Sequence, residues 1–387
     1  MKRIEAIIAT LALAFALGAC AQPVPQQPAD TSQPEEPAAE EAAPAFGSWS
    51  EDAPAIAALK EYVEDVTDES SPNYIPPEAR IVASDFDGTL FGELNPVYFD
   101  WALSVHRVLY DSTYQATDEQ IAIAKQIEET ERTGVYQSTG MWDQAHMAAE
   151  AYAGMTPDEL WDYSIAFAEQ PSPKFKNMYR GEAYYVPMLE IVEYLLDNGF
   201  TFYVVTGTDR TVARSLVDGI IDIPPSQVIG SDNTLVGSSQ ADVDGLDYDW
   251  NSGEERDQLV FGGEFVIKDL KTNKVTAIWR EIGAQPVIAL GNSSSDYAML
   301  SYTIDNNPRR SLALFVLADD VEREWGNPEK ADKYRAECEE LGYIPISTRD
   351  DWKTIYGGDV EKDDDWVWDS PDATGPNSTL EAVADAA

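Results

Sequence analysis

The sequence predicts an α/β protein with a doubly wound, mostly parallel sheet and an inserted helical domain. Short apolar runs alternate with segments of helical periodicity along most of the chain, and this alternation is typical of parallel sheets. Three of the apolar runs end in Asp, Thr or Asn close to Gly, where open sheets carry their functional groups. The stretch between Leu90 and Thr206 is mostly helical in pattern and exceeds the length of an ordinary connection.

The first half of the chain contains one predicted strand among helices. The run IVAS at residues 81–84 is apolar, and Gly88 follows it with a turn, as expected after a buried strand. Pro54 suits the first turn of a helix. Apolar residues at helical spacing predict helices over residues 54–66, 98–108, 118–131, 141–153 and 157–168.

In the second half, strands and helices alternate regularly. The helix over 186–196 ends in Asp-Asn-Gly, which is a typical stop, and the strand FTFYVVTG follows. Residues 231–263, rich in Asp, Gly and Asn, are expected to form a β-hairpin extension. The remaining predicted elements are helices over 212–217, 273–282 and 297–302 and strands over 227–229, 287–290 and 312–316.

The charge of the chain is strongly negative. It has 26 Lys and Arg against 70 Asp and Glu, a formal net charge of −44. Such a surface repels nucleic acid, so we expect no nucleic-acid partner. It also repels a phosphorylated substrate at long range, so a phosphate site needs local cations, which a bound metal can supply. The acidity fits either adaptation to high salt or a generally acidic exported surface.

The N-terminus has the pattern of an export signal, with a basic start, an apolar stretch and then small residues. The segment LGAC at residues 17–20 resembles the lipobox of bacterial lipoproteins, which implies a lipid on Cys20 and anchoring at the extracytoplasmic face of the cell membrane. A lipidated Cys20 leaves Cys338 without a partner, so we expect no intramolecular disulfide.

Chemistry-bearing residues gather at the predicted strand ends. Asp85 and Asp87 follow the strand at 81–84, Thr206 and Gly207 end the strand FYVV, and the stretch GNSSSD follows the strand at 287–290. Lys274 stands at the start of a predicted helix. Since the carboxyl ends of parallel strands share one edge of a sheet, we expect these groups to meet there.

This ordered set resembles the haloacid dehalogenase superfamily, in its phosphoserine-phosphatase-like branch. DFDGTL matches the first family motif, VVTG the second, Lys274 before VTAI the third and GNSSSD the fourth. The order of the motifs and their strand contexts make the match specific. The resemblance covers roughly residues 80–351 and implies a Rossmann-like core with a helical cap inserted after the first strand.

The resemblance implies a role for each motif residue. Asp85 is expected to attack phosphorus and form an aspartyl-phosphate, with Asp87 as general acid and then base. Thr206, Gly207 and Lys274 are expected to bind the phosphate, and Mg²⁺ is the expected cofactor. The expected metal ligands are Asp85, Asp87, Asn292 and Asp296.

Two assignments stay open at this point. Asn292 stands where an aspartate metal ligand is common, so Asp296 is either the remaining acidic ligand or a partner that orients Lys274 or the metal water. Lys268 and Lys271 are close rivals of Lys274. We favour Lys274 because the pattern VTAIWREIG begins immediately after it.

The expected domains follow from these observations. Aromatic residues in the cap, including Trp142 and Tyr152, give some resemblance to phosphorylcholine phosphatases, although we favour ordinary packing between cap helices as their explanation. We expect a lipoprotein signal peptide at 1–20, a disordered linker at 21–50, an α/β core at 51–94 and 186–356, a helical cap at 95–185, and an acidic disordered tail at 357–387.

The sequence therefore predicts a lipid-anchored, magnesium-dependent phosphatase of a small organic phosphomonoester. A phosphotransferase on the same scaffold is the first alternative. The second alternative is a non-catalytic surface binding protein on an inactive scaffold, which the Asn292 departure keeps open and the intact Asp85, Asp87, Thr206 and Lys274 oppose.

Overall fold

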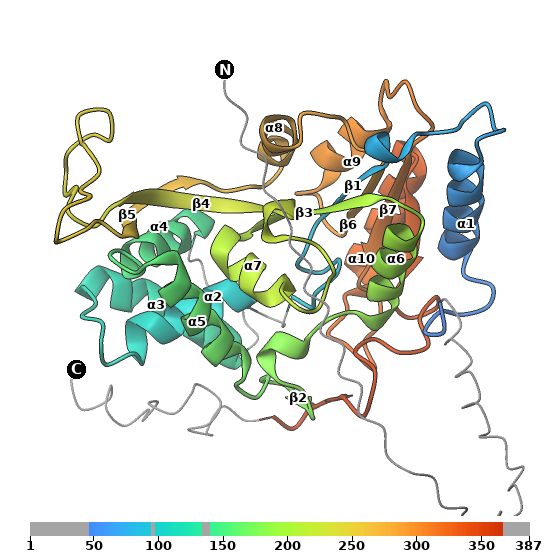
Figure 1. Cartoon of the computed structure of the whole chain (residues 1–387). Helices are drawn as coiled ribbons and strands as arrows, with labels where there is room; N and C mark the ends of the chain where they lie inside the picture. Colours follow the sequence, from blue (N-terminus) through green and yellow to red (C-terminus); the bar gives the residue numbers. More distant parts are fainter. Residues whose placement is uncertain (1–45, 94–96, 134–139, 367–387) are drawn as a thin grey trace, which may run out of the picture. The chain divides into compact units, whose positions relative to one another are not determined.

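The centre of the molecule is a seven-stranded sheet with helices on both faces (Figure 1). The structure is a computed structural model that describes residues 46–93, 97–133 and 140–366. Its strands are β1 (Ile81–Ser84), β2 (Phe175–Lys176), β3 (Thr201–Asp209), β4 (Val228–Gly237), β5 (Leu259–Ile267), β6 (Ile288–Gly291), β7 (Leu312–Leu317), β8 (Ile344–Ser347) and β9 (Glu361–Lys362).

The order of the strands confirms a mostly parallel sheet. They lie in the order β5-β4-β3-β1-β6-β7-β8, while β2 and β9 form a separate antiparallel pair. β1 pairs in parallel with β3 and with β6, and parallel pairing continues to β4 on one side and to β8 on the other. β4 and β5 pair antiparallel, which is the hairpin expected over 231–263.

The helices agree closely with the predicted ones. They are α1 (Pro54–Thr67), α2 (Phe99–Leu109), α3 (Asp118–Thr133), α4 (Met141–Ala151), α5 (Pro157–Ala168), α6 (Val186–Asp197), α7 (Arg210–Val217), α8 (Thr272–Glu281), α9 (Tyr297–Ile304) and α10 (Pro328–Leu341), with short 3-10 helices at Pro77–Ala79, Arg180–Glu182 and Pro225–Gln227. None of the described helices has the length and apolarity needed to span a bilayer.

Alternate residues of the central strands face two different cores, which makes the sheet doubly wound. Val82 of β1 and Leu290 of β6 belong to one buried cluster with α1, α6 and α7. Ala83 and Ala289 belong to a second cluster with α8, α9 and α10. This is the period of two that a pleated strand imposes on its side chains.

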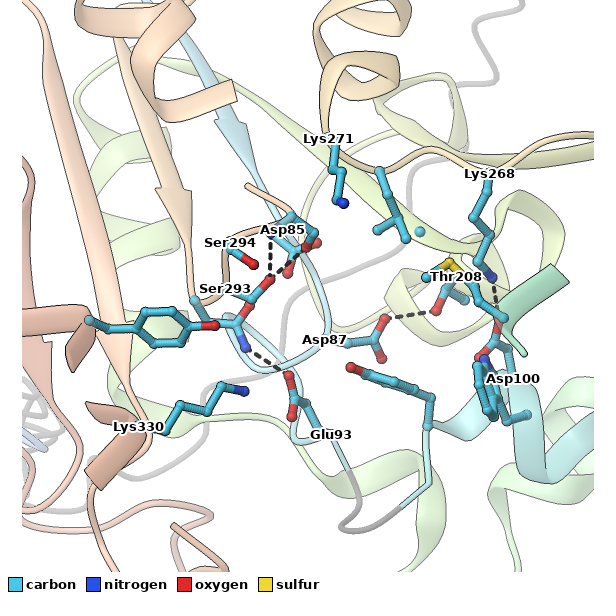
Figure 2. A pocket seen from close by; sticks show the side chains of 18 residues that line it. Asp85, Asp87, Glu93, Asp100, Thr208, Lys268, Lys271, Ser293, Ser294 and Lys330 are labelled. Carbon is cyan, nitrogen blue, oxygen red and sulfur yellow. Dashed lines mark hydrogen bonds and ion pairs between the residues drawn. The ribbon is translucent and has the colours of Figure 1, made fainter. Parts of the chain in front are cut away.

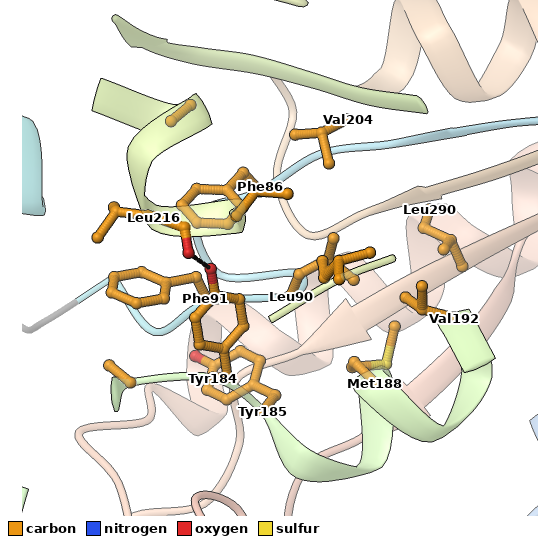
Figure 3. Close-up of a cluster of buried hydrophobic side chains, with 14 of the residues drawn as sticks. Phe86, Leu90, Phe91, Tyr184, Tyr185, Met188, Val192, Val204, Leu216 and Leu290 are labelled. Atoms are coloured by element: carbon orange, nitrogen blue, oxygen red, sulfur yellow. Dashed lines mark hydrogen bonds between the residues drawn. The ribbon is translucent and has the colours of Figure 1, made fainter. Parts of the chain in front are cut away.

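An aromatic cluster anchors the loop that follows β1 (Figure 3). Phe86 and Phe91 stack with their ring centroids 5.1 Å apart, and the ring of Tyr184 meets Phe91 edge-on at 5.1 Å. The hydroxyl of Tyr184 donates a hydrogen bond to the carbonyl of Leu216 in α7 at 2.6 Å. The two aspartates of the first motif therefore lie on a loop that its own aromatic residues hold in place.

Order extends further than expected at both ends of the core. Trp49 is 2% exposed, and its indole donates a hydrogen bond to the carbonyl of Pro187 at 2.9 Å. At the other end, β9 pairs with β2. The linker expected over 21–50 therefore ends too late, and the disordered tail expected over 357–387 begins too early. Residues 1–45 and 367–387, including Cys20, lie outside the described residues.

Candidate active site

Three strand ends meet at one edge of the sheet because β1 lies between β3 and β6. The amide of Asp85 donates a hydrogen bond to the carbonyl of Leu290, the penultimate residue of β6, at 2.9 Å. The connections after β1 and β6 therefore leave the sheet side by side. This is the crevice at which open α/β sheets bind their ligands.

Lys274 reaches into this edge from α8 and is fully buried. Its Nζ lies 2.5 Å from Asp85 Oδ1 and 2.8 Å from Asp296 Oδ1, and it donates a hydrogen bond to the carbonyl of Val205 at 2.7 Å. Burial alone lowers the pKa of Lys274, but the charges of Asp296 and Asp85 more than offset this and hold the pKa above its usual value. The structure therefore supplies a permanent cation beside Asp85.

Asp296 holds both Lys274 and the loop after β6. It is fully buried, and its Oδ2 accepts hydrogen bonds from the amides of Asn292 and Ser293 at 3.1 and 3.0 Å. A Cβ at Gly291 would lie 2.6 Å from the Asp296 Cβ, so this close approach requires glycine. Between the two roles left open by the sequence, the geometry favours orientation of Lys274.

Asp87 is held from β3. Its Oδ2 accepts a hydrogen bond from the hydroxyl of Thr208 at 2.7 Å and a longer one from Thr206 at 3.4 Å. Burial, followed by the charges of Asp100 and Asp85, raises the pKa of Asp87 well above its usual value. A raised pKa makes a carboxyl group better suited to hold and donate the proton that general acid chemistry requires.

The edge opens into a cavity of about 320 Å³ (Figure 2). Asp85, Asp87, Glu93 and Asp100 face it with Thr208 and Lys268. The other lining residues are Tyr98, Trp101, Met141, Gly207, Leu270, Lys271, Asn292, Ser293, Ser294, Ser295, Lys330 and Tyr334. The cavity thus combines carboxylates, lysines and aromatic rings around the two motif aspartates.

The family is decided by a comparison with family models. The model of the haloacid dehalogenase-like hydrolases matches residues 82–301, from β1 into α9. The chain belongs to this family. The haloacid dehalogenase fold explains why the four motifs converge, since the matched segment contains β1, β3, β6 and α8.

Several solved structures are similar to this haloacid dehalogenase-like chain at low identity. A functionally unknown protein from Anaerococcus prevotii shares 12% identity with a TM-score of 0.46, over 78% of this chain and 92% of that chain. Cytosolic 5'-nucleotidase IIIB bound to cytidine shares 12% with a TM-score of 0.42, over 76% and 84%. A phosphoserine phosphohydrolase-like protein from Francisella tularensis shares 16% with a TM-score of 0.35, over 68% and 99%. No curated protein matches the chain.

The oxygen donors at the edge fit a hard divalent cation. Asp85 offers a carboxylate, Asp87 a backbone carbonyl and Asn292 an amide oxygen, and all three residues line the same cavity. The described residues contain no group of three or more His, Cys, Asp or Glu side chains placed to hold a metal. Mg²⁺ commonly uses one or two carboxylates with several waters, so this donor set fits it.

The structure brings the residues predicted from the sequence together, but Thr208 of the same strand faces the cavity in place of Thr206. Gly207 lines the cavity, whereas the fully buried Thr206 lies behind it, and its hydroxyl accepts a hydrogen bond from the Thr208 amide at 3.1 Å. Thr208, which the sequence analysis did not include, contacts Asp87 more closely. Thr208 could have been predicted from the alternation of side chains along a strand, because residues 206 and 208 lie on the same face.

Several residues that line the cavity were also not predicted from the sequence. Glu93, Tyr98, Asp100 and Trp101 come from the segment after β1, and Lys330 and Tyr334 come from α10. The aromatic residues singled out in the cap do not form this wall: Tyr152 is buried in the core, and Trp142 packs on Phe265 of β5. The packing explanation therefore fits them better.

Proposed function

We propose that this haloacid dehalogenase-like hydrolase is a magnesium-dependent phosphatase of a small organic phosphomonoester. One observation carries the proposal: Asp85 and Asp87 face one cavity, and buried Lys274 contacts Asp85 at 2.5 Å. A nucleophilic carboxylate, an acid and a fixed cation are the groups that phosphoryl transfer through an aspartyl-phosphate requires.

The residues divide the reaction into two steps. In the first, a carboxylate oxygen of Asp85 forms a bond to phosphorus while the bond to the leaving oxygen breaks, and Asp87 gives that oxygen its proton. In the second, Asp87 takes a proton from water, whose oxygen bonds to phosphorus and releases Asp85 and inorganic phosphate. Lys274 and the Gly207 amide stabilise the phosphoryl oxygens, and Thr206 supports this strand end from behind the cavity by accepting a hydrogen bond from the Thr208 amide. Mg²⁺, held by Asp85, Asp87 and Asn292, would neutralise phosphate charge.

The cavity supports a small substrate. Its volume of about 320 Å³ is at the lower end of ligand pockets in proteins. Lys268, Lys271 and Lys330 supply local positive charge in a chain of net charge −44. These lysines attract a phosphorylated metabolite to the cavity, whereas the rest of the acidic surface repels it.

We also propose that the protein is exported and anchored at the extracytoplasmic membrane face through a lipid on Cys20. The sequence LGAC after an apolar stretch supports this. Labelling of cells with a fatty-acid analogue should mark the chain but not its Cys20→Ala variant. Equal labelling of both would contradict the proposal.

Hydrolysis of p-nitrophenyl phosphate by the full chain in detergent tests the activity. We expect turnover with Mg²⁺, its loss when EDTA is added, and its loss in Asp85→Asn. The matched control is Asp244→Asn, which makes the same change at an exposed residue of the β4–β5 loop. Added glycerol separates transfer to an alcohol, which yields glycerol phosphate, from hydrolysis, which yields only inorganic phosphate. A folded protein inactive with several metals would contradict catalysis.

A further inference from the structure

Glu93 contacts the side chain of Asn292, the residue that stands where the family motif commonly has an aspartate. Asn292, in the loop after β6, donates a hydrogen bond from its Nδ2 to Glu93 Oε1 at 2.8 Å (Figure 2). The two residues come from loops that follow different strands, so the fold, and not sequence proximity, brings them together. An amide oxygen can bind a divalent cation, but it brings no negative charge to the site.

The turn after Asp87 leaves room for this pair. Gly88 has a φ of +76°, and a Cβ there would lie 1.8 Å from Asn292 Nδ2 and 2.7 Å from Glu93 Oε1. A side chain at Gly88 would therefore displace both groups. The glycine brings the Asn292 amide and the Glu93 carboxylate against the loop that carries the two motif aspartates.

The carboxylate of Glu93 forms no direct ion pair in the described part of the chain, although the positive charge of Lys330 acts on it from the same cavity. Lys274 pairs with Asp85 at 2.5 Å, and Lys268 lies 3.8 Å from Asp100. A partly buried carboxylate without a direct ion pair, hydrogen-bonded to an amide that lines the same cavity as Asp85 and Asp87, is suited to act together with a bound metal ion.

We propose that Glu93 is a positioning residue for a divalent cation at Asn292. By accepting the Nδ2–H it fixes the amide so that Oδ1 remains for the cation, and it adds the negative charge that an aspartate would have provided. The inference rests on the proposed function only in that a divalent cation binds at Asp85. Glu93 compensates for the asparagine and keeps the site functional.

Binding of Mn²⁺ to the full chain in detergent, measured by the electron paramagnetic resonance signal of free Mn²⁺ without substrate, tests this directly. Glu93→Gln keeps a hydrogen-bond acceptor but removes the charge, and we expect it to raise the Kd by about 10-fold or more. The exposed Glu254→Gln variant is the control, because it lowers the net negative charge of the chain equally.

The decisive variant exchanges the carboxylate and the amide between positions 93 and 292. In Glu93→Gln combined with Asn292→Asp, the charge moves to the metal-facing residue and the hydrogen bond runs in the opposite direction. We expect its Kd to return to within about 3-fold of the parent, well short of the loss in Glu93→Gln alone. Circular dichroism of each variant identifies any that fails to fold.

Three results would overturn the inference. One is a Kd for Glu93→Gln equal to that of Glu254→Gln, and another is a reversed pair that binds no better than Glu93→Gln. The third is a Glu93→Gln variant with unchanged Mn²⁺ affinity and a raised KM for amino-substituted phosphomonoesters, since Glu93 would then bind substrate. Mn²⁺ binding that depends on Glu93 without phosphatase activity would leave this inference intact and contradict only the proposed function.

Discussion

Two buried carboxylates in the site depend on neighbours from other elements. Asp85 shares Lys274 with Asp296, and Asp87 is held by Thr208. Removal of one partner therefore alters both the stability of the site and the protonation of its acid. The effect on stability and the effect on protonation can be separated with variants that change only one of the two.

Thr208→Val removes the hydroxyl that donates to Asp87 while keeping the shape of the side chain. We expect kcat/KM for p-nitrophenyl phosphate to fall about 10- to 100-fold. The Thr208 hydrogen bond lowers the pKa of Asp87, so its loss should move the pH limb assigned to Asp87 to higher pH. Thr208→Ser should retain both properties. An unchanged rate and pH profile in the valine variant would show that Thr208 does not position Asp87.

Lys274→Met leaves two buried carboxylates without their cation. We expect a loss of about 3–5 kcal/mol in the free energy of unfolding, measured with urea, together with loss of turnover. Adding Asp296→Asn removes one of the uncompensated charges and should restore part of the stability but none of the activity. A double variant as unstable as Lys274→Met would contradict this account of the Asp85–Lys274–Asp296 group.

At the scale of elements, α2 contains a histidine that burial keeps neutral. His106 Nδ1 lies 2.6 Å from the Tyr163 hydroxyl, and no group in the described structure hydrogen-bonds its Nε2. Burial, assisted by the charge of Arg180, lowers the pKa of His106 from 6.5 to about 4. Proton uptake by His106 therefore favours the unfolded state.

This shift predicts an acid-sensitive helical insertion. The contribution of His106 is fully present above pH 6.5 and is lost as the pH falls toward 4, because the unfolded chain binds the proton first. The predicted loss reaches about 3 kcal/mol. His106→Phe in a Tyr163→Phe background, compared with that background alone by urea unfolding at pH 7 and pH 5, should lose less stability at pH 5. Parallel losses in both proteins would show that His106 is not responsible.

Strong local patterns predicted most of these elements, and weak ones did not. Residues 81–84 and 157–168 match β1 and α5, because a bounded apolar run and a Thr156–Glu159 capping box fix their ends. β8 was missed because Pro345 interrupts a four-residue edge strand. The cavity wall was missed for another reason: Lys330 of α10 and Glu93 of the loop after β1 line the same cavity only through the tertiary fold.

At the scale of the whole molecule, the net charge of −44 affects stability. Self-repulsion among surface carboxylates destabilises the folded chain and is screened by salt, whereas buried pairs such as Lys274 with Asp296 are screened much less. We expect the Tm to rise by about 2–5 °C from low salt to 1 M NaCl. Sucrose at equal osmolality controls for solvent exclusion. A Tm that falls with NaCl would mean that surface ion pairs outweigh the repulsion.

The central claim is that Asp85 carries the phosphoryl group, and trapping the intermediate tests it most directly. The Asp87→Asn variant lacks the base for the second step, so brief reaction with p-nitrophenyl phosphate and Mg²⁺ followed by acid quenching should accumulate it. Mass spectrometry of the peptide that contains residues 81–92 should show one added phosphoryl group on Asp85, absent from Asp85→Asn. Mg²⁺-dependent turnover with no phosphoryl group on Asp85 would contradict the account.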